Sequence, residues 1–256
     1  MTTTLNYKKF GNEGEVLIIL HGLFGSLDNW QSIAQNLAKY FQVYIVDQRN
    51  HGKSPHFSEH NYTLMAADLK QFMEQLSIDS ANLLGHSMGG KTVMQFAIEN
   101  PQMVNKLIVA DIAPKYYAPH HQSILKALNA VDFSKISNRK EAEDVLNSYI
   151  SDAGTKQFLL KNLTWETQDK LTWKFNFKTL ENEIENIGEE LNGFAYFTNP
   201  TLFLKGEKSN YILESDLDKI EEIFPLSKVV EIKNSGHWLH AENPKDFINE
   251  VLNFIK

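Results

Sequence analysis

One serine in this sequence has surroundings that predict chemistry. Ser87 lies in the pentapeptide GHSMG (residues 85–89), directly after the apolar run Ala81–Leu84 and before a segment of helical period. A sharp strand-to-helix turn of this kind presents the serine hydroxyl above a sheet, and it needs small neighbours because larger Cβ groups would clash. Short G-x-S-x-G strings also arise by chance, but the flanking strand and helix favour a nucleophile over a plain turn.

A serine hydroxyl becomes a useful nucleophile only when a base removes its proton. We predict that His237 is this base, because it follows the last apolar run and precedes the final helix, at the C-terminal edge of a doubly wound sheet. His86 lies inside the turn itself, and His240 begins to enter the helix. We assign structural or surface roles to His51, His56, His60, His120 and His121.

Backbone amides near Ser87 are predicted to stabilise a developing oxyanion. The helix after Ser87 directs the amide of Met88 toward the reacting atoms. A glycine-containing loop, His21–Gly25, follows the first long strand and brings a second amide, that of Leu23, or of Phe24 if the turn is offset by one residue. A plain glycine turn is the competing interpretation of this loop.

Alternating strands and helices must position these groups. The candidate strands are short and rich in β-branched residues: Val16–Leu20, Val43–Val46, Ala81–Leu84, Lys106–Ala110, Thr201–Lys205 and Val229–Ile232. The helical segments between and after them are Leu27–Lys39, Leu64–Leu76, Met88–Glu99 and Leu213–Phe224, with a last helix that opens at Asn243 and Pro244. This alternation predicts a mostly parallel sheet with helices on both faces.

The alternation stops in the middle of the chain, which indicates an insertion. We predict a core domain formed by residues 1–113 and 200–256, and a helical cap formed by residues 114–199, in which we find no convincing strand. Such a cap would supply the apolar roof of a pocket above the sheet. Aromatic residues near this pocket, Phe24, Trp30 and Trp238, could line the acyl site, although packing is the commoner role for such residues.

The composition excludes several classes of function. The chain has 256 residues and a formal net charge of −7, without a basic block suited to nucleic acid. It has no cysteine, which excludes a disulfide framework and a thiolate nucleophile. We find no metal-binding or phosphate-binding motif, so we expect no cofactor and no metal. The polar N-terminus and the short apolar runs predict neither a signal peptide nor a membrane span, and therefore a cytoplasmic protein.

Five motifs, spread in order along nearly the whole chain, resemble the YbfF-type esterases of the α/β-hydrolase superfamily. They are HGLFGSLDNW (residues 21–30), DQRNHGKS (47–54), GHSMGGK (85–91), DIAP (111–114) and SGHWLHAE (235–242). The resemblance implies the α/β-hydrolase fold, with an eight-stranded sheet, a helical cap and a Ser–Asp–His triad. It also implies a carboxylesterase that acts on small acyl esters. An acyl-CoA thioesterase, or a ligand receptor with slow hydrolysis, is the alternative.

The acid of the triad departs from the commonest pattern of the superfamily. Most of these hydrolases carry it in a G-x-x-D turn, which here reads GEKS (residues 206–209) and ends at Ser209. Because a serine cannot balance an imidazolium charge, we predict that Asp111 is the acid, as in the D-I-A-P segment of the YbfF type. An ordinary turn aspartate is the competing interpretation of Asp111. Glu207 and Asp216 are the rival acids, and Ser209 is a possible auxiliary member.

Overall fold

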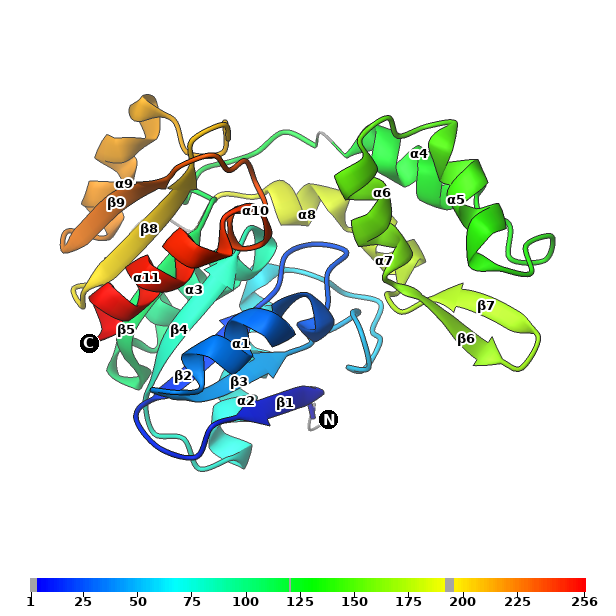
Figure 1. Cartoon of the computed structure of the whole chain (residues 1–256). Helices are drawn as coiled ribbons and strands as arrows, with labels where there is room; N and C mark the ends of the chain where they lie inside the picture. The colour runs from blue at the N-terminus through cyan, green and yellow to red at the C-terminus, as the bar shows by residue number, and fades with distance from the viewer. Residues whose placement is uncertain (1–3, 120, 192–195) are drawn as a thin grey trace.

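A seven-stranded sheet forms the centre of the computed structural model, which describes residues 4–119, 121–191 and 196–256 (Figure 1). Its strands are β1 (Tyr7–Phe10), β2 (Val16–Leu20), β3 (Gln42–Val46), β4 (Ala81–His86), β5 (Val104–Ala110), β8 (Thr201–Gly206) and β9 (Ser227–Ile232). The spatial order is β1-β3-β2-β4-β5-β8-β9. Only β1 pairs antiparallel to its neighbour in this sheet, so the carboxyl ends of the other strands meet at one edge.

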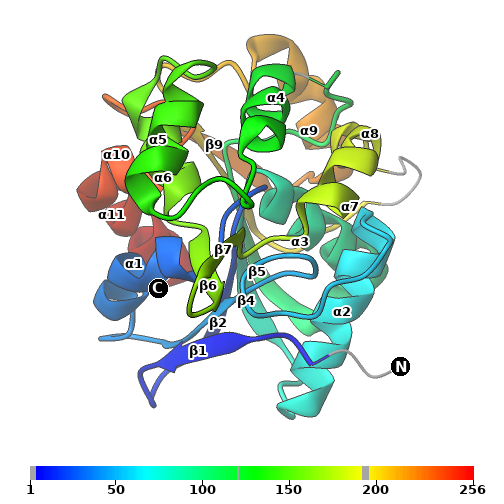
Figure 2. The ribbon, with the colours of Figure 1, turned by 90° about the vertical axis from the view of Figure 1, so that its right-hand side faces the viewer.

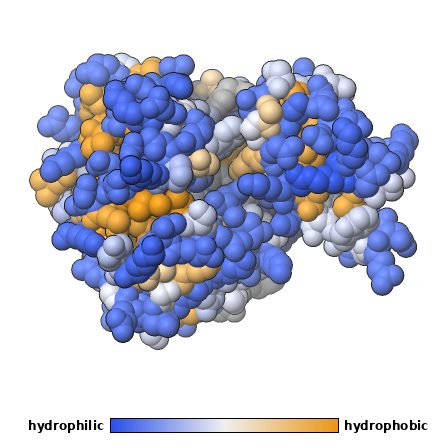
Figure 3. All heavy atoms as spheres, viewed as in Figure 1, coloured by the Kyte–Doolittle hydropathy of each residue, from blue (hydrophilic) through white to orange (hydrophobic). Residues whose placement is uncertain are grey.

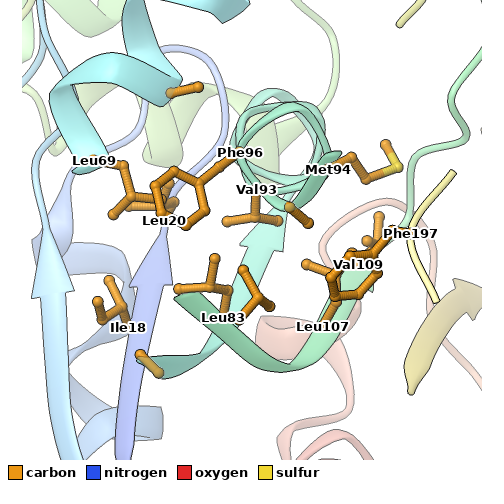
Figure 4. Close-up of a cluster of buried hydrophobic side chains, with 14 of the residues drawn as sticks. Ile18, Leu20, Leu69, Leu83, Val93, Met94, Phe96, Leu107, Val109 and Phe197 are labelled. Carbon is orange, nitrogen blue, oxygen red and sulfur yellow. The ribbon is translucent and has the colours of Figure 1, made fainter. Parts of the chain in front are cut away.

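Helices cover both faces of the sheet: in Figure 2 the strands lie between two sets of helices. One face carries α1 (Gln31–Leu37) and α11 (Pro244–Ile255), and the other carries α2 (Tyr62–Gln75), α3 (Met88–Glu99) and α9 (Leu217–Ile223). Successive residues of β2 alternate between the two cores, because side chains of a strand point to opposite faces. Ile18 and Leu20 pack with Leu69, Val93 and Phe96 of α2 and α3 (Figure 4).

The segment between β5 and β8 forms a separate layer beside the carboxyl edge of the sheet, which we call the cap. It contains α4 (Gln122–Ala130), α5 (Arg139–Asn147), α6 (Ala153–Leu160), β6 (Leu163–Thr167), β7 (Lys170–Trp173), α7 (Phe177–Asn182) and α8 (Ile184–Gly188). Its apolar side chains form one cluster with Leu23, Phe24 and Met88 of the core. Polar contacts also join the two layers: Asn162 donates to the carbonyl of Phe24 at 2.7 Å, and Tyr62 donates to that of Ile187 at 2.6 Å.

Short helices complete the described chain at the ends of longer elements. They are the 3₁₀ helices η1 (Leu27–Trp30), η2 (Pro101–Met103) and η3 (Glu214–Asp216), and the one-turn helix α10 (Leu239–Glu242). The predicted helices at residues 27–39 and 213–224 therefore each divide into a 3₁₀ turn and a shorter α-helix.

Two expectations about strands are wrong for the described residues. The sheet has seven strands rather than eight, because it ends at β1, where Lys8 and Lys9 are exposed and discourage further edge pairing. The cap does contain strands: β6 and β7 form an antiparallel hairpin. Most of β6 is exposed, so its sequence lacks the apolar run that marks a buried strand.

Candidate active site

Three side chains from distant parts of the sequence meet at the carboxyl edge of the sheet. Ser87 follows β4, Asp111 follows β5, and His237 lies in the loop after β9. Nε2 of His237 lies 3.0 Å from Oγ of Ser87, and Nδ1 of the same ring lies 2.8 Å from Oδ2 of Asp111. The structure thus brings together the serine, histidine and aspartate that the sequence indicated, at distances suited to proton transfer.

The turn around Ser87 is strained in the way its sequence implies. Ser87 has φ 53° and ψ −118°, outside the regions that a serine ordinarily occupies. A Cβ at Gly85 would overlap the carbonyl oxygen of Gly89, and a Cβ at Gly89 would overlap that of Leu20. Only glycine therefore fits on either side, and α3 begins at Met88 with its first amide beside the serine.

Asp111 is held by donors from the turn that follows β8. The amide of Gly206 donates to Oδ1 of Asp111 at 2.9 Å, and the hydroxyl of Ser209 donates to Oδ2. The carboxylate is fully buried, so these donors replace the water that would otherwise stabilise its charge. Ser209 thus lies beside Asp111, the candidate acid, at the end of the GEKS turn.

The two rival carboxylates contact other partners. Glu207 accepts from the amide of Asn234 at 2.7 Å and from Lys233, and these contacts lower the pKa of its carboxyl. Asp216 pairs with Lys115 at 2.6 Å and accepts from the amide of Leu213. Of the three candidate acids, Asp111 is the one in contact with His237.

Two aromatic neighbours fix the orientation of His237. The ring of Tyr211 stacks on the imidazole with centroids 3.8 Å apart and an angle of 14°. Nε2 of His86 donates to the carbonyl of His237 at 2.7 Å, while burial holds the pKa of His86 well below its usual range. No sequence pattern indicated a role for Tyr211, and His86 was placed only in the turn. A ring that stacks across the loop leaves no local sequence signal.

Hydrogen bonds around the loop at residues 21–25 distinguish its two candidate oxyanion donors. The amide of Phe24 donates to Nε2 of His51 at 3.2 Å, and Nδ1 of His51 donates to the carbonyl of Arg49 at 2.9 Å. Burial holds the pKa of His51 well below its usual range, so the ring is neutral and can accept. Among the residues that the structure describes, the amide of Leu23 has no such acceptor, which favours Leu23 as the donor.

Comparison with known proteins identifies the family. The sequence model of the α/β-hydrolase fold matches residues 15–244. The chain belongs to the α/β-hydrolase family. The YbfF esterase of Escherichia coli is 35% identical over 242 residues, which cover 93% of this chain and 92% of that protein. The sn-1-specific diacylglycerol lipase ABHD11 of Danio rerio is 36% identical over 262 residues, covering 98% of this chain and 82% of the relative.

This α/β-hydrolase also resembles a solved structure in both sequence and fold. The chain titled "Marine microorganism esterase" is 47% identical, with a TM-score of 0.96, and the match covers 98% of this chain and 99% of that one. The predicted resemblance to YbfF-type esterases is confirmed, and the expected α/β-hydrolase fold with it.

Two cavities of this α/β-hydrolase meet at Ser87. The narrow one, about 30 Å³, is bounded by Met88 and Ile112 of the core and Ile184 and Ile187 of the cap. The wide one, about 240 Å³, has His237 in its wall. The residues predicted to bind substrate all line the wide cavity: Phe24, Trp30 and Trp238. His121 borders both cavities, a position that its sequence surroundings did not indicate, and His120 lies outside the described residues.

Two further properties concern the described part of this α/β-hydrolase. Within residues 4–119, 121–191 and 196–256, no group of three or more His, Asp or Glu side chains is placed to hold a metal ion. None of the helices described there has both the length and the apolar character that a bilayer span requires.

Proposed function

We propose that this protein is a serine carboxylesterase in which Ser87, His237 and Asp111 form the catalytic triad. The observation that carries the proposal is the continuous path from Ser87 Oγ through both nitrogens of His237 to Asp111, with steps of 3.0 and 2.8 Å. The names of the relatives, esterases and an sn-1-specific diacylglycerol lipase, support an ester as the substrate.

The first half of the proposed reaction forms an acyl-enzyme. Nε2 of His237 takes the hydroxyl proton of Ser87 as Oγ attacks the ester carbonyl, and Asp111 balances the charge of the imidazolium. The amides of Leu23 and Met88 donate to the oxyanion of the tetrahedral intermediate. The carbon–oxygen bond to the alcohol then breaks, and His237 returns its proton to the departing oxygen.

The second half releases the acid. His237 takes a proton from water, whose oxygen attacks the acyl carbon, and the same two amides bind the second oxyanion. Collapse of this intermediate breaks the bond to Ser87 Oγ, which regains its proton from His237. The same sequence of steps would open an acyl-CoA thioester, with a thiol as the leaving group.

Replacement of the nucleophile tests this function. Ser87→Ala should lower kcat for p-nitrophenyl acetate by about 10⁴-fold or more, because loss of a triad member removes the covalent route. The variant should keep the circular dichroism spectrum of the unmodified protein, since the smaller side chain fits the same turn. Ser58→Ala, at an exposed serine outside both cavities, is the matched control and should retain full activity.

Two outcomes would contradict the proposal. Undiminished turnover by Ser87→Ala would remove Ser87 from the mechanism. A single stoichiometric burst of p-nitrophenol from the unmodified protein, without further turnover, would instead favour a receptor with slow hydrolysis. Parallel assays with acetyl-CoA compare ester with thioester cleavage.

A further inference from the structure

The two cavities at Ser87 differ in size and in their relation to the proposed base. The narrow cavity of about 30 Å³ has Met88 in its wall, and His237 does not border it. The wide cavity of about 240 Å³ is bordered by His237 and the adjacent Trp238. Ser87 and Leu23 border both, so the reacting carbon lies where the cavities join. A substrate bound at Ser87 therefore has one small and one large compartment available.

The chemistry of the tetrahedral intermediate decides which half of an ester enters which compartment. Its carbon carries four substituents: Oγ of Ser87, the oxyanion, the alcohol oxygen and the acyl chain. The amides of Leu23 and Met88 fix the direction of the oxyanion. The alcohol oxygen must face Nε2 of His237, because that atom protonates it as it departs. The alcohol therefore extends along the wide cavity, and the acyl chain takes the remaining direction, into the narrow one.

We infer that this enzyme selects esters that join a short acyl chain to a bulky apolar alcohol, an inference that rests on the esterase function proposed above. A cavity of about 30 Å³ has room for about two or three water-sized groups, which corresponds to acyl chains of about two to four carbons. Its walls are formed by packed side chains such as Ile112, Ile184 and Met88, so a longer chain would collide with them.

The walls of the wide cavity indicate the chemistry of the alcohol. Phe24 and Trp30 approach from the core, Ile124 and Phe158 from the cap, and Trp238 from the loop beside His237. The rings of Phe158 and Trp238 lie 5.6 Å apart, across the boundary between cap and core. Figure 3 shows the surface hollowed between these two layers. This aromatic lining suits an aryl or branched alkyl alcohol. Phe24, Trp30 and Trp238 are thereby assigned to the alcohol side rather than to the acyl pocket.

A pair of isomeric esters tests the assignment on the unmodified enzyme. 2-Phenylethyl acetate has a short acyl chain and an aromatic alcohol, and ethyl phenylacetate reverses the two halves with the same atoms. We expect kcat/KM for 2-phenylethyl acetate to be higher by about tenfold or more, since one misplaced group in a tight pocket costs about 1–3 kcal/mol. p-Nitrophenyl acetate serves as the reference substrate.

The reference substrate separates failure of the inference from failure of the proposed function. Equal rates for the isomers, faster cleavage of ethyl phenylacetate, or cleavage of neither while p-nitrophenyl acetate is hydrolysed, would overturn the compartment assignment alone. Absence of hydrolysis of all three esters would remove the esterase function itself.

Two variants test the compartments separately. Ile184→Ala widens the narrow cavity and should raise kcat/KM for p-nitrophenyl hexanoate relative to the acetate by about tenfold. Phe158→Ala widens the other cavity and should lower the preference between the phenylethyl isomers while leaving the hexanoate-to-acetate ratio near that of the unmodified enzyme. If Ile184→Ala changed only the preference between the phenylethyl isomers, and Phe158→Ala changed only the hexanoate-to-acetate ratio, the assignment of acyl and alcohol to the two cavities would be reversed.

Discussion

At the scale of single residues, the candidate site contains backbone strain. Ser87, Asp111 and Phe24 have φ of 53°, 52° and 57°, a region that non-glycine residues rarely occupy. Each such residue costs about 1–3 kcal/mol and persists only when its surroundings fix it. Contacts of its carboxylate with Gly206 and Ser209 fix the conformation of Asp111. The hydrogen bond from its amide to His51 fixes that of Phe24. Asn50, Ser77 and Asn234 share this backbone region elsewhere, so strain alone does not mark a site, but it does fall on two members of the proposed triad.

The assignment of the acid can be tested by removing its charge. Asp111→Asn should lower kcat/KM by about 10⁴-fold near neutral pH, because the amide neither balances the imidazolium nor holds the required tautomer. Glu207→Gln is the matched control and should stay within a few-fold of the unmodified enzyme, since its carboxylate faces Asn234 and Lys233. Steady-state assays with p-nitrophenyl acetate measure both variants. A severe loss in Glu207→Gln with a mild one in Asp111→Asn would move the role to Glu207.

A rescue experiment adds a second test of the same residue. Ser209 donates to Oδ2 of Asp111, so a carboxylate at position 209 would lie close to the vacated charge. Adding Ser209→Asp to the Asp111→Asn variant should restore part of the lost activity. If the double variant were no more active than Asp111→Asn alone, the two positions would not be interchangeable sources of the charge.

At the scale of elements, Lys91 joins the helix after the nucleophile to the cap. This fully buried side chain on α3 donates to the carbonyl of Gly188 at 3.2 Å and to that of Glu189, at the end of α8. Its ammonium also lies over the rings of Tyr62 and Tyr117, at 5.5 and 4.9 Å from their centroids. One buried amine therefore connects the helix that begins at Met88 with the wall of the narrow cavity.

The buried lysine predicts a rise of stability in alkaline solution. Burial lowers the pKa of Lys91 to about 7, from 10.5 in the unfolded chain. The unfolded state therefore holds more protons between these values, and the free energy of unfolding should increase with pH by up to about 1.4 kcal/mol per unit from pH 7 to about 9. Burial raises the pKa of Tyr62 and Tyr117, so near pH 10 the unfolded chain loses these protons first, and this opposes any further rise. Urea unfolding at several pH values measures the slope.

Substitution of Lys91 tests whether this residue causes the dependence of unfolding free energy on pH. Lys91→Met should abolish the rise between pH 7 and about 9. Lys106→Met is the matched control, because Lys106 also donates to two main-chain carbonyls, those of Phe254 and Ile255, yet lies partly exposed near the surface. Lys106→Met should retain the rise. A slope that survives in Lys91→Met would show that another group carries it.

The elements also show why part of the fold could be predicted from the sequence. Each of the central strands β2, β4 and β5 contains an apolar run, because both faces of a parallel sheet are buried. The edge strand β1 reads YKKF, and the hairpin strand β6 reads LTWET. Neither carries an apolar run, and β1 pairs with the distant strand β3, whereas β6 pairs with its neighbour β7 on a largely exposed surface. The interruption of the pattern predicted a helical insertion, whereas the hairpin of β6 and β7 left no comparable signal.

The candidate site likewise has some features with a local sequence signal and others that depend on contacts between distant segments. The glycines around Ser87 mark a local turn whose geometry forbids other residues, so the sequence located it. The choice between Leu23 and Phe24 depended on a bond to His51, 27 positions from Phe24. The stacking of Tyr211 on His237 and the contact of Ser209 with Asp111 likewise join segments far apart in sequence. Such contacts exist only once the sheet has brought strand ends together.

At the scale of the whole molecule, the core contains several histidines kept neutral by burial. These histidines are His21, His51, His60, His86 and His240. Burial lowers the pKa of each ring, to about 3 for His60 and His240. Neutral rings can both donate and accept, and His21 does so between the carbonyl of Gly22 and the amide of Gln48. Protonation would turn each acceptor nitrogen into a donor and break such a bond.

This set predicts a protein that loses stability in mild acid. A histidine whose pKa is lowered on folding takes up protons preferentially when unfolded, so its contribution is complete above pH 6.5 and falls as the pH drops toward the folded value. At pH 5.5 a histidine whose folded pKa is about 3, such as His60 or His240, costs about 1.4 kcal/mol relative to neutral pH, and the set together costs several kcal/mol. We expect the urea midpoint to fall steeply between pH 7.5 and 5.5. A midpoint constant over this range would contradict the prediction.

His240 offers a way to isolate one member of the set. Its ring stacks on Trp30 with centroids 4.2 Å apart, and among the described residues its buried Nδ1 has no hydrogen-bond partner. Phenylalanine can keep the stacking without a titratable nitrogen, so His240→Phe should unfold at a similar urea concentration at pH 7.5. At pH 5.5 it should exceed the unmodified protein by about 1.4 kcal/mol in unfolding free energy, the linkage contribution of one histidine. His56→Phe, at an exposed residue, serves as the control and should leave the difference between the two pH values unchanged. An equal loss of stability in acid for His240→Phe and the unmodified protein would mean that His240 is not among the groups that carry this dependence.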